Sequence, residues 1–438
     1  MGRDAIILLT MRVAGTLFWM GYTIILARTL SREDFALTLY VVNFSMIAVL
    51  IVTLGRDVAL LRLASQAWEV GAHSAVRQML AKSRKAVLLA SVLLTAVLLG
   101  AWATGLDTPV TASPEIALLS GLITLAGAQM GLNRDTLRSV GKVWQSQVGF
   151  NFIRTIVPAT GAIALYFLVE MSAELALIVF LVALGLSVLV EEVILRRLSW
   201  QDDLSAPQPD QAELMRAGLQ LWPGNIANAV QMRIGGLVAG LALAPEIAAL
   251  FLAAERIANL AQFPIAAAGQ AGAPRVAQAA SRSMRDTQIE LGKAGLLMFL
   301  GALVGCFGAA LVAWPALWAL GTEYLAALPL TLILVCAHLS WAVFGFGQNA
   351  LNLTGHHHVY RNVAVTASLA GACIMSLVAA EYGSLAMAWA YCGMWWATNL
   401  GFVLALYMNT RLQTGLFAVR YAKMRWLFAK PGGDKEQA

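Results

Sequence analysis

Long apolar stretches alternate with short polar loops along nearly the whole chain. A helix that crosses a bilayer needs about 20 apolar residues, and twelve stretches of the chain are long and apolar enough to cross a membrane. The pattern therefore predicts an all-α integral membrane protein with about twelve transmembrane helices. The predicted spans lie near residues 5–27, 36–55, 86–104, 115–133, 147–169, 174–195, 216–242, 247–270, 291–313, 326–350, 362–380 and 384–408.

The basic residues gather in every second loop. The intervening loops carry acidic residues instead, apart from the first, where Arg28 and Arg32 stand beside Glu33 and Asp34. Loops rich in Lys and Arg stay in the cytoplasm, so both termini are predicted to be cytoplasmic. The basic segments are Arg56–Lys85, Arg134–Lys142, Arg196–Arg216, Arg275–Lys293, His356–Arg361 and Arg411–Lys435.

The overall composition agrees with a membrane protein. Hydrophobic residues make up 59% of the chain and charged residues only 12%, whereas a soluble domain contains about 25% charged residues. The net charge of +6 follows from the basic loops and does not indicate a nucleic-acid partner. Arg3 leads into an apolar segment too long for a signal-peptide core, so the first helix is expected to stay in the mature chain.

A polar segment divides the chain near its middle. Residues 199–212 read "SWQDDLSAPQPDQA" and include two prolines, a composition typical of a linker. The sequence therefore predicts a six-helix bundle over residues 1–198, a cytoplasmic linker over 199–212 and a second six-helix bundle over 213–410. Residues 411–438 form a basic tail, in which each cation near anionic lipid contributes about 1 kcal/mol to membrane binding.

The two predicted bundles show a weak internal repeat. The segment "ARTLSREDFALTLY" from Ala27 aligns with "AGLALAPEIAALFL" from Ala239, and "LRSVGK" ending at Lys142 aligns with "LNLTGH" ending at His356. Duplicated halves are typical of transporters that bind substrate between them. A repeat of membrane topology alone is the other interpretation of the same alignment.

Several segments resemble recurring motifs of polysaccharide transporters. "ILARTLSREDFALTLYVVNF" and "GRDVALLRLAS" resemble the segments around their second helix, and "ALNLTGHHH" resembles the phrase after their tenth. "ALFLAAERIANLAQFPIAAAGQAGAPRVAQ" resembles the counterpart in the second half. From about residue 5 to 408, the chain thus resembles the multidrug/oligosaccharidyl-lipid/polysaccharide (MOP) exporter superfamily, and within it the Wzx-like flippases of lipid-linked oligosaccharides. Ala36 and Ala248 stand where glycine is usual, which indicates a divergent member.

Arginines inside the predicted spans are the main candidates for binding. A charge at the centre of a bilayer costs at least about 2.5–3.5 kcal/mol on insertion scales, and the guanidinium group matches phosphate oxygens two at a time. The resemblance implies a cationic cavity for a polyprenyl pyrophosphate, so Arg12, Arg154, Arg233 and Arg256 are candidate ligands. Arg12 and Arg154 also lie where side chains can reach the cytoplasmic surface, and Arg256 is equally suited to an ion pair with another helix.

The predicted span 216–242 carries a polar stripe. Asn225, Asn228 and Gln231 recur every third residue and therefore share one side of a helix. Pro223–Gly224 is expected to bend or loosen the helix before them. The stripe suits a water-filled substrate path, and it equally suits hydrogen bonding between packed helices.

Acidic residues are rare within the predicted spans. Glu255 alone lies well inside one, where it could couple transport to H⁺ or Na⁺ or pair with an arginine. Asp57, Glu191 and Glu192 lie near cytoplasmic helix ends and are expected to be solvated.

Neither cysteine nor histidine predicts a metal site or a cofactor. The four cysteines have no zinc-like spacing, and the three adjacent histidines lack further ligands nearby in sequence. They are Cys306, Cys336, Cys373, Cys392, His356, His357 and His358.

The resemblance implies a flippase rather than an enzyme. It would move an undecaprenyl-pyrophosphate-linked oligosaccharide across the cytoplasmic membrane by alternating access, for O-antigen, capsule or exopolysaccharide synthesis. Its expected partners are membrane lipids, a polysaccharide polymerase and glycosyltransferases. A cation-coupled drug or metabolite antiporter of the same superfamily is the alternative. A membrane polymerase or ligase is disfavoured, because every predicted outer loop is short.

Overall fold

Helices make up all the regular structure in the residues that the computed structural model describes, which are 2–198, 200, 211–280 and 282–421. The predicted all-α class is therefore confirmed. The proposed linker at 199–212 lies almost wholly outside this range, as does most of the basic tail. The count of twelve spans and the cytoplasmic position of the termini remain predictions.

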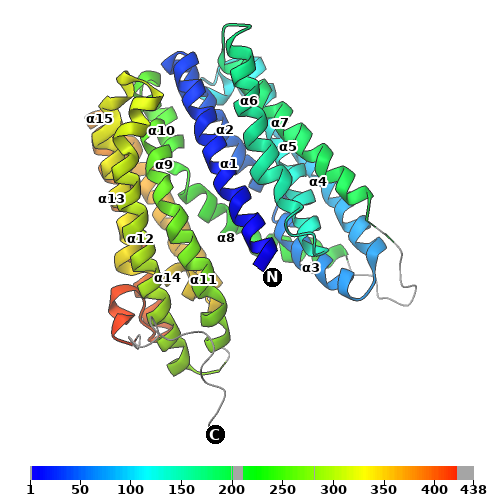
Figure 1. The fold of residues 1–438 in the computed structure, drawn as a ribbon, viewed down its shortest axis with the longest axis vertical. Helices are drawn as coiled ribbons and strands as arrows, with labels where there is room; N and C mark the ends of the chain where they lie inside the picture. The colour runs from blue at the N-terminus through cyan, green and yellow to red at the C-terminus, as the bar shows by residue number, and fades with distance from the viewer. Residues whose placement is uncertain (1, 199, 201–210, 281, 422–438) are drawn as a thin grey trace. The chain divides into compact units, whose positions relative to one another are not determined.

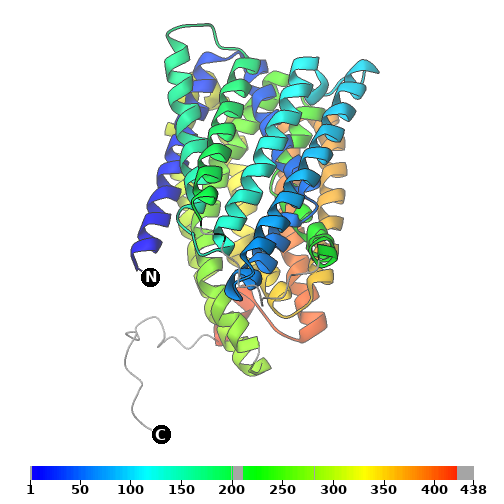
Figure 2. The ribbon, with the colours of Figure 1, turned by 90° about the vertical axis from the view of Figure 1, so that its right-hand side faces the viewer.

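Figures 1 and 2 show the described helices in chain order. The first ten elements are α1 (Gly2–Thr29), α2 (Arg32–Thr53), α3 (Arg56–Glu69), α4 (His73–Ala103), η1 (Pro109–Thr111), α5 (Pro114–Ser139), η2 (Val148–Ile153), α6 (Arg154–Tyr166), α7 (Ala173–Arg196) and α8 (Gln211–Gln231). The remaining ten are α9 (Ile234–Ala242), α10 (Pro245–Ala258), η3 (Asn259–Ala261), α11 (Gln262–Ala280), α12 (Met284–Leu320), η4 (Thr322–Ala327), α13 (Leu328–Phe344), α14 (Gly347–Leu353), α15 (His357–Thr410) and η5 (Gly415–Tyr421).

Eight helical segments among the described residues are long and apolar enough to cross a membrane. They are α2, α4, α5, Val148–Tyr166, α7, α12, Thr322–Phe344 and α15. Gly383 interrupts α15 with φ +76° and ψ −166°, a backbone conformation that favours glycine. This break lies between the last two predicted spans, so α15 is two helices joined at a kink.

The chain forms two compact units. The first comprises Met1–Leu252 with Ala319–Gly321, and the second comprises Ala253–Trp318 with Thr322–Ala438. Within the first unit, α5 packs against α2, α4 and α7, while α6 packs against α1 and α7. Figures 1 and 2 show these helices running side by side. The predicted equivalence of bundles 1–198 and 213–410 stays a prediction.

Serine side chains fix the start of three helices in the first unit. Ser31 Oγ accepts a hydrogen bond from the Asp34 amide at 3.0 Å, Ser113 Oγ from Ile116 at 3.2 Å, and Ser172 Oγ from Leu175 at 3.3 Å. Each bond satisfies an amide that would otherwise lack a partner in the first turn. These caps begin α2, α5 and α7, and each lies in a loop that the charge pattern assigns to the outer side.

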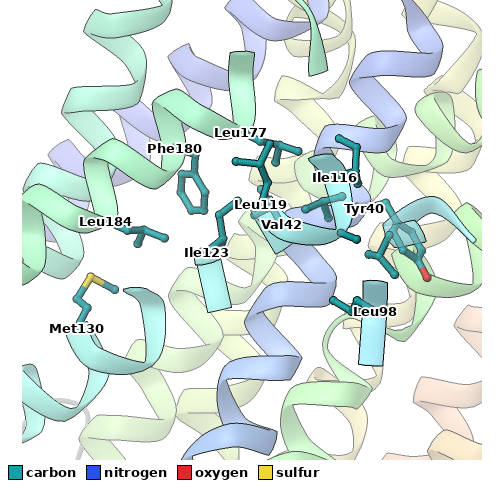
Figure 3. Close-up of a cluster of buried hydrophobic side chains, with 13 residues drawn as sticks. Tyr40, Val42, Leu98, Ile116, Leu119, Ile123, Met130, Leu177, Phe180 and Leu184 are labelled. Atoms are coloured by element: carbon teal, nitrogen blue, oxygen red, sulfur yellow. The ribbon is translucent and has the colours of Figure 1, made fainter. Parts of the chain in front are cut away.

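A cluster of buried apolar side chains holds α2, α4, α5 and α7 together in the first unit (Figure 3). Lipid tails are as apolar as these side chains, so close packing rather than the hydrophobic effect stabilises such a bundle. Gly121 allows α4 and α5 to approach, because a Cβ atom there would lie 2.0 Å from Thr95 Oγ1. The cluster includes Tyr40, Val42, Leu98, Ile116, Leu119, Ile123, Met130, Leu177, Phe180 and Leu184.

Candidate functional site: a cationic cavity in the first unit

A cavity of about 170 Å³ lies within the first unit. Its only charged lining residues among those described are Asp57, Arg134, Arg154 and Arg233, which come from four separate elements. Ile123, Met130, Phe180 and Leu184 are among the residues that belong both to its wall and to the core cluster (Figure 3). The other lining residues are Val42, Ser45, Met46, Val49, Leu50, Thr53, Gly127, Gly131 and Phe150.

Arg154 enters the cavity wall at the start of α6, directly after the π-helical turn η2. Its Cζ atom lies 4.0 Å from the centroid of the Phe150 ring, and its guanidinium Nη1 lies 4.0 Å from Met46 Sδ. The Cζ atom of Arg134 lies 4.8 Å from the centroid of the same Phe150 ring. The ring therefore contacts two cations, and each such contact is worth about 0.5–2 kcal/mol depending on desolvation.

Arg233 lies at an interruption between two helices. α8 ends at Gln231 and α9 begins at Ile234, and Arg233 itself has φ −128° and ψ −2°. Its amide donates to Val230 O at 2.9 Å, and its guanidinium donates to Ala229 O at 3.4 Å. α8 continues through Pro223, so the interruption comes later than the bend expected at Pro223–Gly224. Substrate sites in transporters are often built at such discontinuous helices.

Arg134 is held by an ion pair at the end of α5. Its Nε and Nη2 donate to the two carboxylate oxygens of Asp135 at 3.1 and 2.9 Å, and Arg138 donates to Asp135 at 3.1 Å. The charge pattern placed Arg134 in a cytoplasmic loop, so it was not predicted as a site residue. The signal in the sequence was weak, since a run of alternating charges at a helix end usually faces solvent.

Two carboxyl groups expected to be solvated are buried. Asp57 is 9% exposed and Glu191 is 0% exposed. Burial raises the pKa of Asp57, although backbone hydrogen bonding and Arg134 oppose the shift. The expectation was wrong because neighbouring elements cover both helix ends. α3, which carries Asp57, packs on α5 and α8, and η2 packs on α7, which carries Glu191. Glu192 is partly exposed and pairs with Arg84 and Arg196.

The structure brings together two of the seven predicted substrate-binding residues, Arg154 and Arg233, in one cavity. Arg12 is exposed on α1 and does not line this cavity. Gln231 is buried at the end of α8, while the side chains of Asn225 and Asn228 lie outside the described part of the structure.

The remaining two predicted residues belong to the second unit. Arg256 is partly buried on α10. Glu255, the candidate for ion coupling, is 5% exposed and lies close enough to Tyr391 for an electrostatic interaction. Both binding and coupling roles stay predictions.

Solved structures of low sequence identity share this fold. An inward-facing multidrug resistance MATE family transporter of the MOP superfamily is 16% identical, covers 93% of this chain and 97% of its own, and has a TM-score of 0.73. The lipid II flippase MurJ in an inward closed conformation is 12% identical over 96% of this chain and 89% of its own, with a TM-score of 0.65. A MOP superfamily transporter from Pyrococcus furiosus is 16% identical over 93% and 92%, with a TM-score of 0.58.

The sequence itself matches a family model. The model describes a polysaccharide biosynthesis protein and covers residues 1–280, a range that includes every residue lining the cavity. Among curated protein sequences, none matches this chain significantly. The resemblance seen in the sequence motifs is thus confirmed, and the chain belongs to the polysaccharide biosynthesis protein family, with the fold of MOP superfamily transporters.

Proposed function

We propose that this membrane transporter flips a polyprenyl-pyrophosphate-linked oligosaccharide across the cytoplasmic membrane. The observation that carries the proposal is the cavity in which Arg134, Arg154 and Arg233 outnumber the single carboxyl group of Asp57. Undecaprenyl is the expected lipid, and the expected product is O-antigen, capsule or exopolysaccharide.

The sign of the cavity charge favours an anionic head group. Three guanidinium groups around a largely apolar cavity give it a net positive charge, which an anionic ligand would compensate during the cycle. A pyrophosphate offers several oxygens to their paired N–H donors, and the low dielectric strengthens those charge-assisted hydrogen bonds. The polyprenyl tail would remain in lipid while the head group crosses, so no covalent step is needed.

The cavity charge disfavours the antiporter of cationic drugs. A cationic cargo would require carboxylates to dominate the cavity, and here arginines do. The polarity of the pocket is a useful discriminator within this fold. In the Pyrococcus furiosus transporter, a binding pocket of reverse polarity suggested a different function. Coupling to H⁺ or Na⁺ through Glu255 and assembly with a polymerase and glycosyltransferases complete the proposal.

The proposal is tested by deleting the gene and measuring lipid-linked glycans by mass spectrometry together with surface polysaccharide. We expect an undecaprenyl-pyrophosphate oligosaccharide to accumulate and the surface glycan to disappear. An unchanged lipid pool with intact surface glycan would count against the flippase and favour the antiporter.

Complementation with point variants then tests the cavity. Arg154→Ala and Arg233→Ala should each fail to restore surface glycan, because losing hydrogen bonds to a charged group costs about 1.5–3 kcal/mol, roughly tenfold or more in affinity. Arg197→Ala is the matched control, since Arg197 is exposed at the end of α7 and does not line the cavity. If both cavity variants restore full function at normal expression, the hypothesis that the cavity binds the head group is refuted.

A further inference from the structure

Glu191 on α7 is a fully buried carboxyl group that the proposed transport cycle has not yet used. It is 0% exposed, and neither side-chain oxygen has a hydrogen-bond partner among the described residues. An ionised carboxylate without hydrogen bonds is strongly destabilising in a protein interior. A group in this setting holds its charge only while a nearby cation compensates it, and it otherwise binds a proton.

The charged groups that act on Glu191 come from two neighbouring helices. They are Arg134 and Asp135 on α5 and Arg84 on α4. Arg134 in turn interacts with Asp57 and Asp135 as well as with Glu191. Of these groups, Arg84 is engaged by Glu192 and Asn133, and Asp135 is shared between Arg134 and Arg138. The charge state of Glu191 therefore bears most directly on Arg134.

Glu191 also lies against the segment that builds the cavity wall. A Cβ atom on Gly149 would lie 2.3 Å from Glu191 Oε1, and Ser187 Oγ donates to Gly149 O at 3.2 Å. Gly149 belongs to η2, which carries Phe150 and leads directly into Arg154. π-helical turns are rare and are frequent at functional sites. η2 bears no titratable side chain, so Glu191 is the ionisable group beneath it.

We propose that Glu191 is a proton-binding site linked to anion binding in the cavity. With Glu191 ionised, its negative charge compensates Arg134 and opposes an anion. When a proton from solvent forms an O–H bond on the Glu191 carboxylate, one of the negative charges around Arg134 is removed, and the net positive charge that a pyrophosphate meets increases. Binding of the anion therefore draws a proton onto Glu191, and release of the anion returns it. This linkage rests on the proposed anionic cargo.

The linkage predicts proton uptake that calorimetry measures directly. Purified protein in detergent is titrated with farnesyl pyrophosphate in buffers that differ in heat of ionisation. The wild type should take up about a third of a proton per anion on average, since its affinity should fall about tenfold as the pH rises from about 6 to about 9, a range in which buried carboxyl groups titrate. Glu191→Gln should bind with no such uptake and with weaker pH dependence.

Glu192→Gln is the matched control, because Glu192 is the adjacent carboxyl group and is partly exposed. It should behave like the wild type. Asp57→Asn tests another buried carboxyl group that acts on Arg134, and this variant should retain the proton uptake. Wild-type binding without proton uptake, or equal uptake in Glu191→Gln, overturns the proposal.

A second measurement keeps the two proposals distinguishable. Infrared difference spectra over the same pH range detect the carbonyl stretch of a protonated carboxyl group without any ligand. A titrating band that Glu191→Gln abolishes, together with no binding of farnesyl pyrophosphate, would support the proton site and refute the anionic cargo. Binding by the wild type without such a band would refute the proton site alone. Should Glu191→Gln fail to fold, the absence of proton uptake by the wild type would still refute the proposal.

Discussion

At the scale of single residues, Phe150 places two positive charges beside each other in an apolar wall. The face of an aromatic ring carries partial negative charge, so it attracts the guanidinium groups of both Arg134 and Arg154. Phe150 therefore helps to position both arginines at the cavity wall.

We predict that Phe150→Leu weakens binding of farnesyl pyrophosphate about threefold to thirtyfold, since one cation–π contact contributes about 0.5–2 kcal/mol. Phe150→Tyr should keep most of the affinity because it keeps the ring. Phe152→Leu is the control, as Phe152 lies on the same π-helical turn and is 41% exposed. Equal affinities for Phe150→Leu and Phe152→Leu in calorimetry would show that the ring does not position the arginines.

Arg154 and Arg233 could be predicted from the sequence because each interrupts a long apolar stretch, where an arginine needs a structural reason. Arg134 and Glu191 could not, since both stand beside other charges at the predicted edge of the membrane. What distinguishes Glu191 is burial by η2, a segment distant in sequence. One hint was present, because Ser187 precedes Glu191 by one helical turn and gives α7 a small polar stripe.

At the scale of elements, the cavity depends on interruptions of helices that hydropathy alone does not reveal. A window of about nineteen residues averages over a turn, so the span 216–242 appears as one helix although it is divided at Met232–Arg233. The same averaging conceals the π-helical turn before Arg154. An arginine of the cavity wall stands at each interruption. Arg154 directly follows the π-helical turn, and Arg233 lies between α8 and α9.

We predict that Gly149→Ala lowers the melting temperature of the purified protein, because the added methyl group would lie 2.3 Å from Glu191 Oε1. Forcing a group into a packed interior costs about 1–3 kcal/mol. Gly185→Ala on α7 is the control, since a Cβ atom there meets no atom within 4 Å.

The double variant Gly149→Ala/Glu191→Ala provides the sharper test of this contact. Removing the Glu191 carboxyl group frees the space that the methyl group needs. Adding Gly149→Ala to Glu191→Ala should therefore cost less stability than adding Gly149→Ala to the wild type. Strictly additive losses in thermal unfolding would mean that the two positions do not interact.

At the scale of the whole molecule, the class of protein was the most predictable property. Apolar stretches of about 20 residues predict membrane-spanning helices, because a helix satisfies its backbone polar groups within its own segment. The motifs around Arg32–Thr53 pointed to the family that the model match then showed. The exact number of crossings was harder, since α8–α9 and α10–α11 consist of shorter pieces.

We predict that both termini and the loop at Lys142 lie in the cytoplasm, while the loop at Asp107 lies outside. Fusions to green fluorescent protein at the C-terminus and after Lys142 should fluoresce, and a fusion to alkaline phosphatase after Asp107 should be active. The opposite pattern of activities would reverse the orientation. The physical reason is the charge difference between the two sets of loops.

All residues that line the cavity lie between Val42 and Arg233. The described lining of the cavity is thus encoded by one contiguous block of the gene. Recombination that replaces the chain beyond Leu252 would keep every arginine of the cavity in place. The downstream part of the chain can therefore vary in sequence without changing the charged groups that line this cavity.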